Sequence, residues 1–447
     1  MTASAARMSP SFPQQPPTKG SCRLWNISIL AVVFLSIYNI ILTLKLMYSP
    51  ECPRHAPVRP PLKAAKCDPQ RPAYSKNEPI FRLDPRLGRW DARLQYKLFD
   101  NILVGERFAS LSDVHRTCLA TQSSLEKMAS LIEVSANWDG PISLATFAAS
   151  DDELSALLLY ILFLRECNAK IREQVSFHFA YPKDRRPKNV NIDLDRLAEM
   201  SCANPISALQ HLVKQYLTST TKWRKKLPYP QNHLRNLARK NCQSKFVFLT
   251  DVDIIPSRGM AEKLDVFLET AKCAGLCAYV IPTYEIDERV RFPPNKTELV
   301  RLANKGLARP FHHKVFIYNQ FATNFTKWQN TADPVQEVHV SHTVTNFEFL
   351  YEPFYVAPDT VPPHDERFVG YGYTRNSQVY EMFVAGYEFL VLSPIFTCHW
   401  GLQVKKTRPP WREHQNNLNR KQFDGFKREI FAKYDKDPLN MMSKRKN

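Results

Sequence analysis

The chain has 447 residues, long enough to bury a sizeable core as one large catalytic unit or as two domains. Hydrophobic residues make up 44% of it, as in globular proteins. The formal net charge is +18, but several basic residues lie in the tails and in a proline-rich segment rather than on one recognisable face, so no nucleic acid partner is predicted.

The first feature along the chain is an uncharged apolar stretch, residues 24–44, between Arg23 and Lys45. About twenty apolar residues are needed to cross a bilayer. The stretch is longer than the core of a signal peptide, so we predict an uncleaved transmembrane signal anchor after a cytoplasmic tail of residues 1–23. Basic residues stand on both sides of the stretch, so charge does not set its orientation.

Sequons and cysteines supply the orientation. Asn295 and Asn324 each begin an Asn-X-Thr sequon, and all of the ten cysteines except Cys22 follow the apolar stretch. Together these features predict a single-pass type II membrane protein whose main part lies in the secretory lumen. Cys273 and Cys277 are close enough for a local disulfide, whereas the other pairings cannot be read from the sequence.

Residues 45–110 are predicted to form a luminal stem, followed by a catalytic domain of residues 111–447. As far as about residue 85 the segment is rich in proline and basic residues, a composition poorly able to fold alone. Aromatic residues return over residues 81–99, which leaves open an ordered arm packed on the main body.

The main body alternates strand and helix patterns, as is typical of βαβ units in a parallel sheet with right-handed crossovers. The predicted strands are residues 117–122, 142–149, 175–182, 246–249 and 277–286, and the predicted helices are residues 123–138, 152–167, 232–240 and 260–273. The predicted class is therefore α/β. Ligands of such sheets bind beyond the carboxyl ends of the strands.

The apolar strand over residues 246–249 is followed by Asp251 and Asp253. In an extended chain these carboxylates point to the same side and repel each other unless a cation lies beside them, so one interpretation is a divalent metal site. The other interpretation is an acidic turn that ends at Pro256 and Ser257. The pair stands where a sheet of this kind binds its ligand.

Two later clusters could complete such a site. Asp365 and Glu366 lie in an irregular aromatic region, and one of them could accept a proton from an attacking hydroxyl group. Alternatively, Glu366 pairs with Arg367 or Arg375 on a solvated loop. His399 follows an apolar strand and is either a third metal ligand, which manganese accepts among oxygens more readily than magnesium does, or a hydrogen-bonded structural residue.

Two other classes of function fit part of this pattern. A strand followed by Asp-X-Asp also opens the metal-dependent phosphatases that use an aspartyl nucleophile. Those enzymes need a later lysine and a further acidic pair of the form Gly-Asp-X-X-X-Asp, which the sequence does not contain. A membrane-anchored lectin would explain the anchor, the sequons and the cysteines, but it gives no reason for all three polar clusters.

Several stretches occur in the order seen in a known family: residues 229–257, 295–302, 323–328, 351–358, 364–378 and 397–401. The chain resembles the beta-1,4-glucuronyltransferases that act on the O-mannosyl glycan of alpha-dystroglycan, and the second catalytic domain of the related bifunctional xylosyl- and glucuronyltransferase. The resemblance covers roughly residues 115–437, and the ordered set is far more specific than Asp-X-Asp alone.

This resemblance implies a GT-A glycosyltransferase fold, dependence on Mn²⁺ and inversion at the anomeric carbon. It also implies a Golgi enzyme that transfers glucuronic acid from UDP-glucuronic acid in beta-1,4 linkage to a xylose-ended O-mannosyl glycan. On the family's pattern, Asp251 and Asp253 form the metal and nucleotide motif, and His399 is the later metal ligand.

The resemblance also places Thr121, Arg235 and Asn236 in segments that face the donor nucleotide. The sugar carboxylate would need a cationic partner, for which the fork of an arginine is well suited, but the sequence does not single out which one.

The chain departs from the family beside the expected acceptor site. Thr374 and Arg375 stand where the family usually has asparagine or a similar polar residue before arginine or lysine, and His364 replaces an aromatic residue before Asp365. These departures bear on the acceptor more than on the donor. A related transferase that uses another UDP-sugar, such as UDP-N-acetylglucosamine, is the alternative. The sequence does not give the oligomeric state.

Overall fold

The computed structural model describes residues 21–47, 80–84, 86–224, 227–333, 337–405 and 409–442. The chain divides into two compact units, Met1–Gln70 and Arg71–Asn447. The first unit contains the 27-residue helix α1 (Ser21–Met47), and most of the predicted tail and stem lies outside the described residues. Among the helices in the described part of the chain, none combines the length and the apolar character that a membrane crossing requires.

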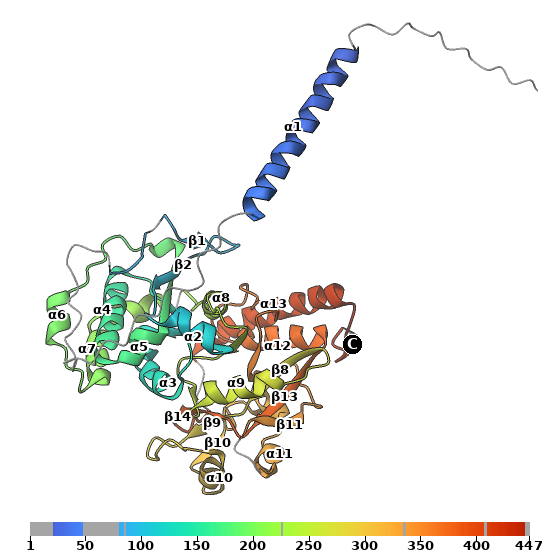
Figure 1. The fold of residues 1–447 in the computed structure, drawn as a ribbon. Helices are drawn as coiled ribbons and strands as arrows, with labels where there is room; N and C mark the ends of the chain where they lie inside the picture. The colour runs from blue at the N-terminus through green and yellow to red at the C-terminus, as the bar shows by residue number, and fades with distance from the viewer. Residues whose placement is uncertain are drawn as a thin grey trace, which may run out of the picture. The chain divides into compact units, whose positions relative to one another are not determined.

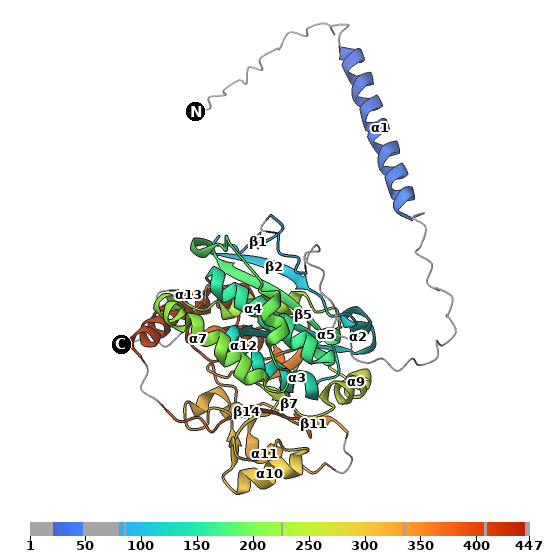
Figure 2. The ribbon, with the colours of Figure 1, turned by 90° about the vertical axis from the view of Figure 1, so that its left-hand side faces the viewer.

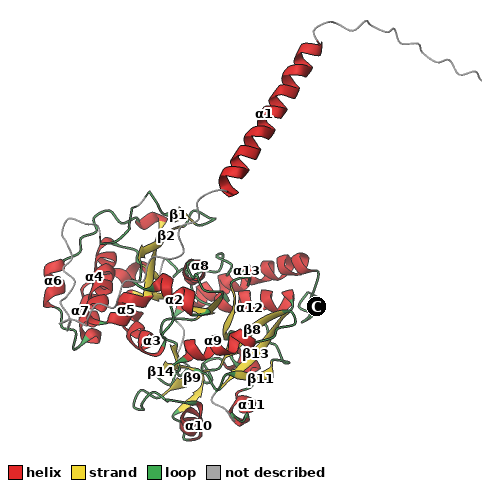
Figure 3. Ribbon diagram, viewed as in Figure 1, coloured by secondary structure: helices red, strands yellow, loops and turns green. Residues whose placement is uncertain are grey.

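The second unit is built on a ten-stranded mixed sheet, drawn in yellow in Figure 3. Its strands, in spatial order, are β1 (Arg89–Trp90), β2 (Tyr96–Leu103), β5 (Val175–Pro182), β4 (Ile142–Phe147), β3 (Thr117–Ser124), β6 (Phe246–Leu249), β12 (Phe354–Pro358), β8 (Leu276–Ile281), β13 (Tyr387–Ser393) and β11 (His339–Thr343). β5, β4, β3 and β6 run parallel, whereas β2, β12 and β11 are antiparallel to their neighbours. The predicted α/β class is confirmed, and the sheet is mixed because antiparallel strands lie beside the parallel ones.

Helices cover both faces of this sheet (Figures 1 and 2). One face packs against α3 (Leu131–Asn137), α4 (Asp151–Cys167) and α9 (Met260–Thr270); the other packs against α8 (Gln231–Lys240) and α12 (Thr374–Ala385). Side chains alternate along a strand, so on β3 Leu119 packs in the first layer and Ala120 in the second. Because these strands are buried on both faces, apolar side chains can occupy successive positions, which explains the continuous apolar runs in the sequence.

The remaining helices and a second sheet surround this core. The helices are α2 (Phe108–Val114), α5 (Ala169–Gln174), α6 (Leu194–Glu199), α7 (Pro205–Arg224), α10 (Lys296–Asn304), α11 (Phe325–Asn330) and α13 (Pro410–Tyr434). The second sheet has the order β10 (Ala308–Pro310), β9 (Thr283–Ile286), β14 (Thr397–Trp400) and β7 (Ile255–Pro256). The strand predicted over residues 277–286 is therefore two strands in different sheets, divided at Pro282, which has no N–H for a ladder.

The end of the predicted stem belongs to the folded body. β2 pairs with β5 in the main sheet, and the side chain of Phe81 is buried in the core. The boundary predicted at residue 110 is therefore too late, and the alternative of an ordered arm over residues 81–99 describes this stretch. The aromatic residues of the arm supply the apolar area that the preceding proline-rich segment lacks.

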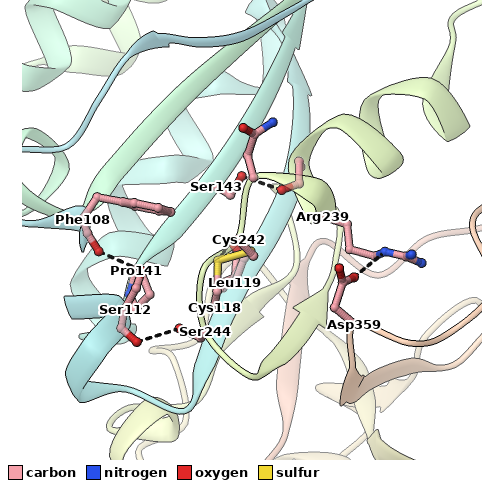
Figure 4. The surroundings of a disulfide bond; sticks show 12 residues. Phe108, Ser112, Cys118, Leu119, Pro141, Ser143, Arg239, Cys242, Ser244 and Asp359 are labelled. Carbon is pink, nitrogen blue, oxygen red and sulfur yellow. Dashed lines mark hydrogen bonds and ion pairs between the residues drawn. A yellow bond between two sulfur atoms is a disulfide. The ribbon is translucent and has the colours of Figure 1, made fainter. Parts of the chain in front are cut away.

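Disulfides join distant parts of the body. Cys118 at the start of β3 is bonded to Cys242, just after α8, and Figure 4 shows this bond beside the ion pair of Arg239 with Asp359. The local bridge predicted between Cys273 and Cys277 is confirmed. A third bond joins Cys167 to Cys202, and Cys398 is a buried free thiol. The Cys118–Cys242 bond fixes α8 against the central strands that lead into the site.

Candidate functional site

The neighbouring parallel strands β3 and β6 bring the first polar side chains together. The pairing continues past the end of β6, where the Thr250 N–H donates to the Ala120 carbonyl oxygen at 3.0 Å. Gln122 then reaches across and donates from Nε2 to Asp251 Oδ1 at 3.1 Å. Asp251 and Asp253 thus stand at the carboxyl edge of the central strands, where α/β sheets bind ligands.

Two guanidinium groups hold the Asp251 carboxylate. Arg235 on α8 donates from Nη2 to Oδ1 at 3.3 Å, and Arg375 at the start of α12 places Nη2 2.9 Å from Oδ2. Burial alone would raise the pKa of Asp251, but the charges of Arg375 and Arg235 and the Gln122 hydrogen bond hold that pKa well below its usual range. Asp251 is therefore a fixed negative charge at neutral pH.

Asp253 has a different neighbourhood. Its Oδ2 lies 3.6 Å from His399 Nε2 and 3.2 Å from Lys127 Nζ. Burial opposes its ionisation, but the His399 imidazole and the Lys127 ammonium lower the pKa of Asp253. A carboxylate and an imidazole at this separation fit a cation that takes both oxygen and nitrogen ligands, such as Mn²⁺. Asp251 already has both of its oxygens engaged.

A cavity of about 350 Å³ opens on one side of the aspartates. It is lined by Gln122, Ser123, Ser124, Lys127, Phe147, Leu227, Tyr229, Gln231, Asp251, Val252, Asp253, Gly370, Tyr371, Trp411, Arg412 and Gln415. Tyr229 donates from its hydroxyl to Gln122 Oε1 at 2.6 Å, and Arg412 lies over the Tyr371 ring. The cavity combines aromatic faces with a cation beside the acidic pair, which suits a flat base that carries phosphates.

A second cavity, of about 250 Å³, also borders both aspartates. It is lined by Arg235, Asp251, Asp253, Phe311, His312, Asn319, Gln320, Glu352, Phe354, Thr374, Arg375, His399 and Gln403. Glu352 is a carboxylate that the sequence analysis did not single out. It accepts a hydrogen bond from Asn319 Nδ2 at 3.0 Å, and burial raises its pKa although Arg375 and Arg235 oppose that shift.

The three residues predicted to face the nucleotide, Thr121, Arg235 and Asn236, have different positions in the structure. Arg235 lines the second cavity. Thr121 is buried on β3, and its hydroxyl has no hydrogen-bond partner among the described atoms, whereas the next residue, Gln122, lines the first cavity. Asn236 holds the loop of the acidic cluster: its Nδ2 donates to the His364 carbonyl oxygen and to Glu366 Oε1 at 2.8 and 3.0 Å.

Asp365 and Glu366 have unequal surroundings, and neither is among the described residues that line the two cavities. Both oxygens of Asp365 accept hydrogen bonds from Arg367, which also pairs with Glu429. Glu366 accepts from Asn236 at Oε1, while His233 Nε2 lies 3.8 Å from its Oε2. Asp365 is therefore fixed by an arginine, whereas Glu366 keeps one oxygen without a close donor among the described residues.

The glycines next to this loop serve packing against α13. A Cβ at Gly370 would lie 2.5 Å from Gln415 Oε1, one at Gly372 would collide with Asn416, and both glycines have positive φ. Asn419 donates to the carbonyl oxygens of Val369 and Gly372. The α13 helix therefore fixes the path of this loop, and Gly370 also lines the first cavity.

His364, which stands before Asp365 where the family has an aromatic residue, is a buried packing residue. Its ring is 1% exposed, and neither ring nitrogen has a hydrogen-bond partner among the described atoms. Burial and the charges of Arg235, Arg375 and Arg239 hold the pKa of His364 well below its usual value, so the ring is neutral. A neutral ring in this place replaces an aromatic one without adding a charge to the site.

Both sequon asparagines are exposed at the start of a helix. Asn295 accepts from the Glu298 N–H at the start of α10, and Asn324 accepts from the Lys327 N–H at the start of α11. These bonds use the side-chain oxygen and leave the amide nitrogen, the atom that carries a glycan, at the surface.

The chain is similar to a known family and to several known proteins. A family model described as "Glycosyl-transferase for dystroglycan" matches residues 116–435. Beta-1,4-glucuronyltransferase 1 of Homo sapiens is 31% identical over 362 residues, covering 78% of this chain and 82% of the relative. The xylosyl- and glucuronyltransferase LARGE1 of Homo sapiens is 27% identical over 285 residues, covering 63% and 30%.

Solved structures align at low similarity. GalNAc-T7 with UDP, GalNAc and Mn²⁺ aligns with a TM-score of 0.35 and 8% identity, covering 71% of this chain and 50% of that one. S. aureus TarS 1-349 in complex with UDP aligns with a TM-score of 0.32 and 12% identity, covering 64% and 60%.

Proposed function

Since the chain belongs to the family of glycosyl-transferases for dystroglycan and is a glycosyltransferase of glucuronyltransferase type, we propose that it transfers glucuronic acid from UDP-glucuronic acid in beta-1,4 linkage. The proposed acceptor is a xylose-ended O-mannosyl glycan, and the proposed fold is GT-A. The mixed sheet with its acidic pair at the carboxyl edge supports that fold.

One observation carries the proposal: Asp251 and Asp253 border two cavities at once. The larger cavity, with Tyr229, Tyr371 and Trp411, suits the uridine, and the smaller one suits a single sugar unit. A sugar nucleotide has its diphosphate between these two parts. The acidic pair would thus stand beside the bond that breaks.

Mn²⁺ is the proposed metal, and Asp253 and His399 are the residues best placed to hold it, with Asp251 as the third predicted ligand. A bound metal of this kind would neutralise the charge of the diphosphate leaving group as a Lewis acid. Lys127 adds a positive charge on the side of the larger cavity, where it can pair with a phosphate oxygen.

The acceptor hydroxyl must lose a proton as it attacks the anomeric carbon, and a nearby carboxylate can take that proton. We propose Glu366 for this role over Asp365, since Asp365 is occupied by Arg367. The Asn236 amide holds the Glu366 carboxylate, and His233 pairs with Asp91 behind it. These residues connect the loop of Glu366 to α8 and to the β1–β2 segment.

A donor panel tests the sugar. Full-length protein with Mn²⁺ and a xyloside acceptor is expected to transfer from UDP-glucuronic acid at least about 100-fold faster than from UDP-glucose or UDP-N-acetylglucosamine, as measured by product formation. Transfer from UDP-N-acetylglucosamine alone would contradict the glucuronyl proposal. A uniformly inactive panel with sugar binding retained would favour the lectin alternative.

We also propose that the chain is anchored in the Golgi membrane as a single-pass type II protein with the body in the lumen. The uncharged residues 24–44, the disulfides and the exposed sequons support this location. In a secretory cell line, Asn295 and Asn324 are expected to carry N-glycans that a glycosidase removes, with a mobility shift that Asn295→Gln and Asn324→Gln each reduce. Unmodified sequons would count against the luminal orientation.

A further inference from the structure

We propose that Arg375 binds the carboxylate of the donor's uronic acid and so makes the enzyme select a uronate over the matching neutral hexose. The inference rests on the proposed function, because it assumes that a sugar nucleotide places its sugar in the smaller cavity. It identifies the cationic partner of the sugar carboxylate, which the sequence did not single out.

Arg375 is a buried cation with unused donors. Arg375 lines the smaller cavity and is 4% exposed, and its guanidinium lies over the Phe354 ring, with Cζ 4.2 Å from the ring centroid. Nη2 is close to Asp251 as an ion pair, but neither Nη1 nor Nη2 makes a hydrogen bond of acceptable direction to any described atom. Buried donors without partners are costly, so this edge of the guanidinium is suited to a ligand acceptor.

The other arginine of the cavity is already used. Arg235 donates from Nη1 to Asn232 Oδ1 at 3.1 Å and to Thr374 Oγ1 at 3.3 Å, and from Nη2 to Asp251. Only its Nε lacks a partner among the described atoms. A carboxylate binds best to two parallel N–H donors, which Arg375 offers and Arg235 does not.

The rest of the cavity suits sugar hydroxyl groups. Glu352 is an acceptor held in place by Asn319. His312 lines the same cavity and offers an imidazole to a sugar hydroxyl group. The cavity has two guanidinium groups among its described lining residues, Arg235 and Arg375, and of these only Arg375 has two unused terminal donors. A hexose with CH₂OH in place of the carboxylate would leave the two unused donors of Arg375 without a charged acceptor.

Arg375 could instead bind a phosphate oxygen of the donor. A comparison of three ligands distinguishes binding to the sugar carboxylate from binding to the diphosphate. Equilibrium dissociation constants are measured with full-length protein and Mn²⁺ for UDP-glucuronic acid, UDP-glucose and UDP. Arg375→Gln is expected to lower the preference for UDP-glucuronic acid over UDP-glucose, given by the ratio of their dissociation constants, about 10- to 100-fold. Any loss of affinity that comes from the pairing of Arg375 with Asp251 is shared by the ligands and cancels in this ratio. Arg375→Lys, which keeps the charge but not the fork, is expected to lie between Arg375→Gln and the unaltered protein.

Arg239→Gln is the matched control. Arg239 is also a buried arginine near the sheet, but it pairs with Asp359 and lines neither cavity among the described residues. Its removal is expected to change stability and not the ratio of the two dissociation constants. This ratio does not depend on the fraction of folded protein, so partial unfolding of a variant does not imitate a loss of selectivity.

The outcomes separate the inference from the function on which it rests. If the unaltered protein prefers UDP-glucuronic acid and Arg375→Gln keeps that preference, the assignment of Arg375 is wrong and the proposed function stands. An equal loss for all three ligands would place Arg375 on the diphosphate and overturn the inference. If the unaltered protein does not prefer UDP-glucuronic acid at all, the proposed function itself fails.

Discussion

An Asp253→Asn variant is expected to lose at least about 100-fold in Mn²⁺-dependent transfer while it remains folded. The substitution removes the charge of the carboxylate that lies 3.6 Å from His399 Nε2, and the electrostatic stabilisation of a leaving diphosphate depends on such charges. The measurements are the initial rate of transfer as a function of Mn²⁺ concentration and the midpoint of thermal unfolding.

The matched control for Asp253 is Asp287→Asn. Asp287 pairs with the exposed Arg289 and lines neither cavity among the described residues, so its substitution is expected to leave the rate of transfer unchanged. Asp253 also pairs with Lys127, whose charge is less balanced in the variant. Full turnover by Asp253→Asn would remove the metal proposal for this carboxylate.

Glu366→Gln is expected to lower the turnover number by about 10²- to 10⁴-fold, the usual contribution of a general base. Asp365→Asn is expected to lower it by less than about tenfold and to reduce thermal stability more, because it weakens the pairing with Arg367 that orders the loop. The measurements are the turnover number at saturating donor and acceptor and the midpoint of thermal unfolding.

Glu429→Gln separates loop order from chemistry. It removes the second carboxylate on Arg367 and leaves Asp365 and Glu366 intact, so a fall in stability with normal turnover is the expected result. Equal and small losses at Asp365 and Glu366 would assign both to a structural loop. Glu352, which lines the smaller cavity, would then be the next carboxylate to replace.

The parts of the site that the sequence predicted are those carried by regular elements. The apolar run of β6 identified a buried strand, so Asp251 and Asp253 had to emerge at its carboxyl end. His399 likewise sits in β14, after the strand β13, and the structure places it near Asp253. Strand periodicity and the rule for ligand sites in α/β sheets placed Asp251 and Asp253 at the edge of the sheet, whereas the prediction that His399 joins them as a metal ligand depended on the family resemblance.

The parts that the sequence missed depend on placement that periodicity does not encode. Thr121 was predicted in place of Gln122, and a shift of one residue on a strand moves a side chain to the opposite face. Glu352 lies just before β12, and no local pattern shows that β12 inserts antiparallel between β6 and β8. Arg375 was considered from the sequence only as a possible partner of Glu366, and the structure shows its pairing with Asp251 and its unused donors.

The position of β12 has a consequence for the order in which the chain folds. β6 pairs with β3 on one side and with β12 on the other, and β12 lies about a hundred residues later in the sequence. During synthesis, β6 therefore has an open edge until residue 358 has emerged, and such distant pairings form slowly. The strand that leads into the acidic pair is the one left open. A chain that stops before residue 354 would expose an apolar edge able to pair with another chain, and the addition of β12 to the sheet closes that edge.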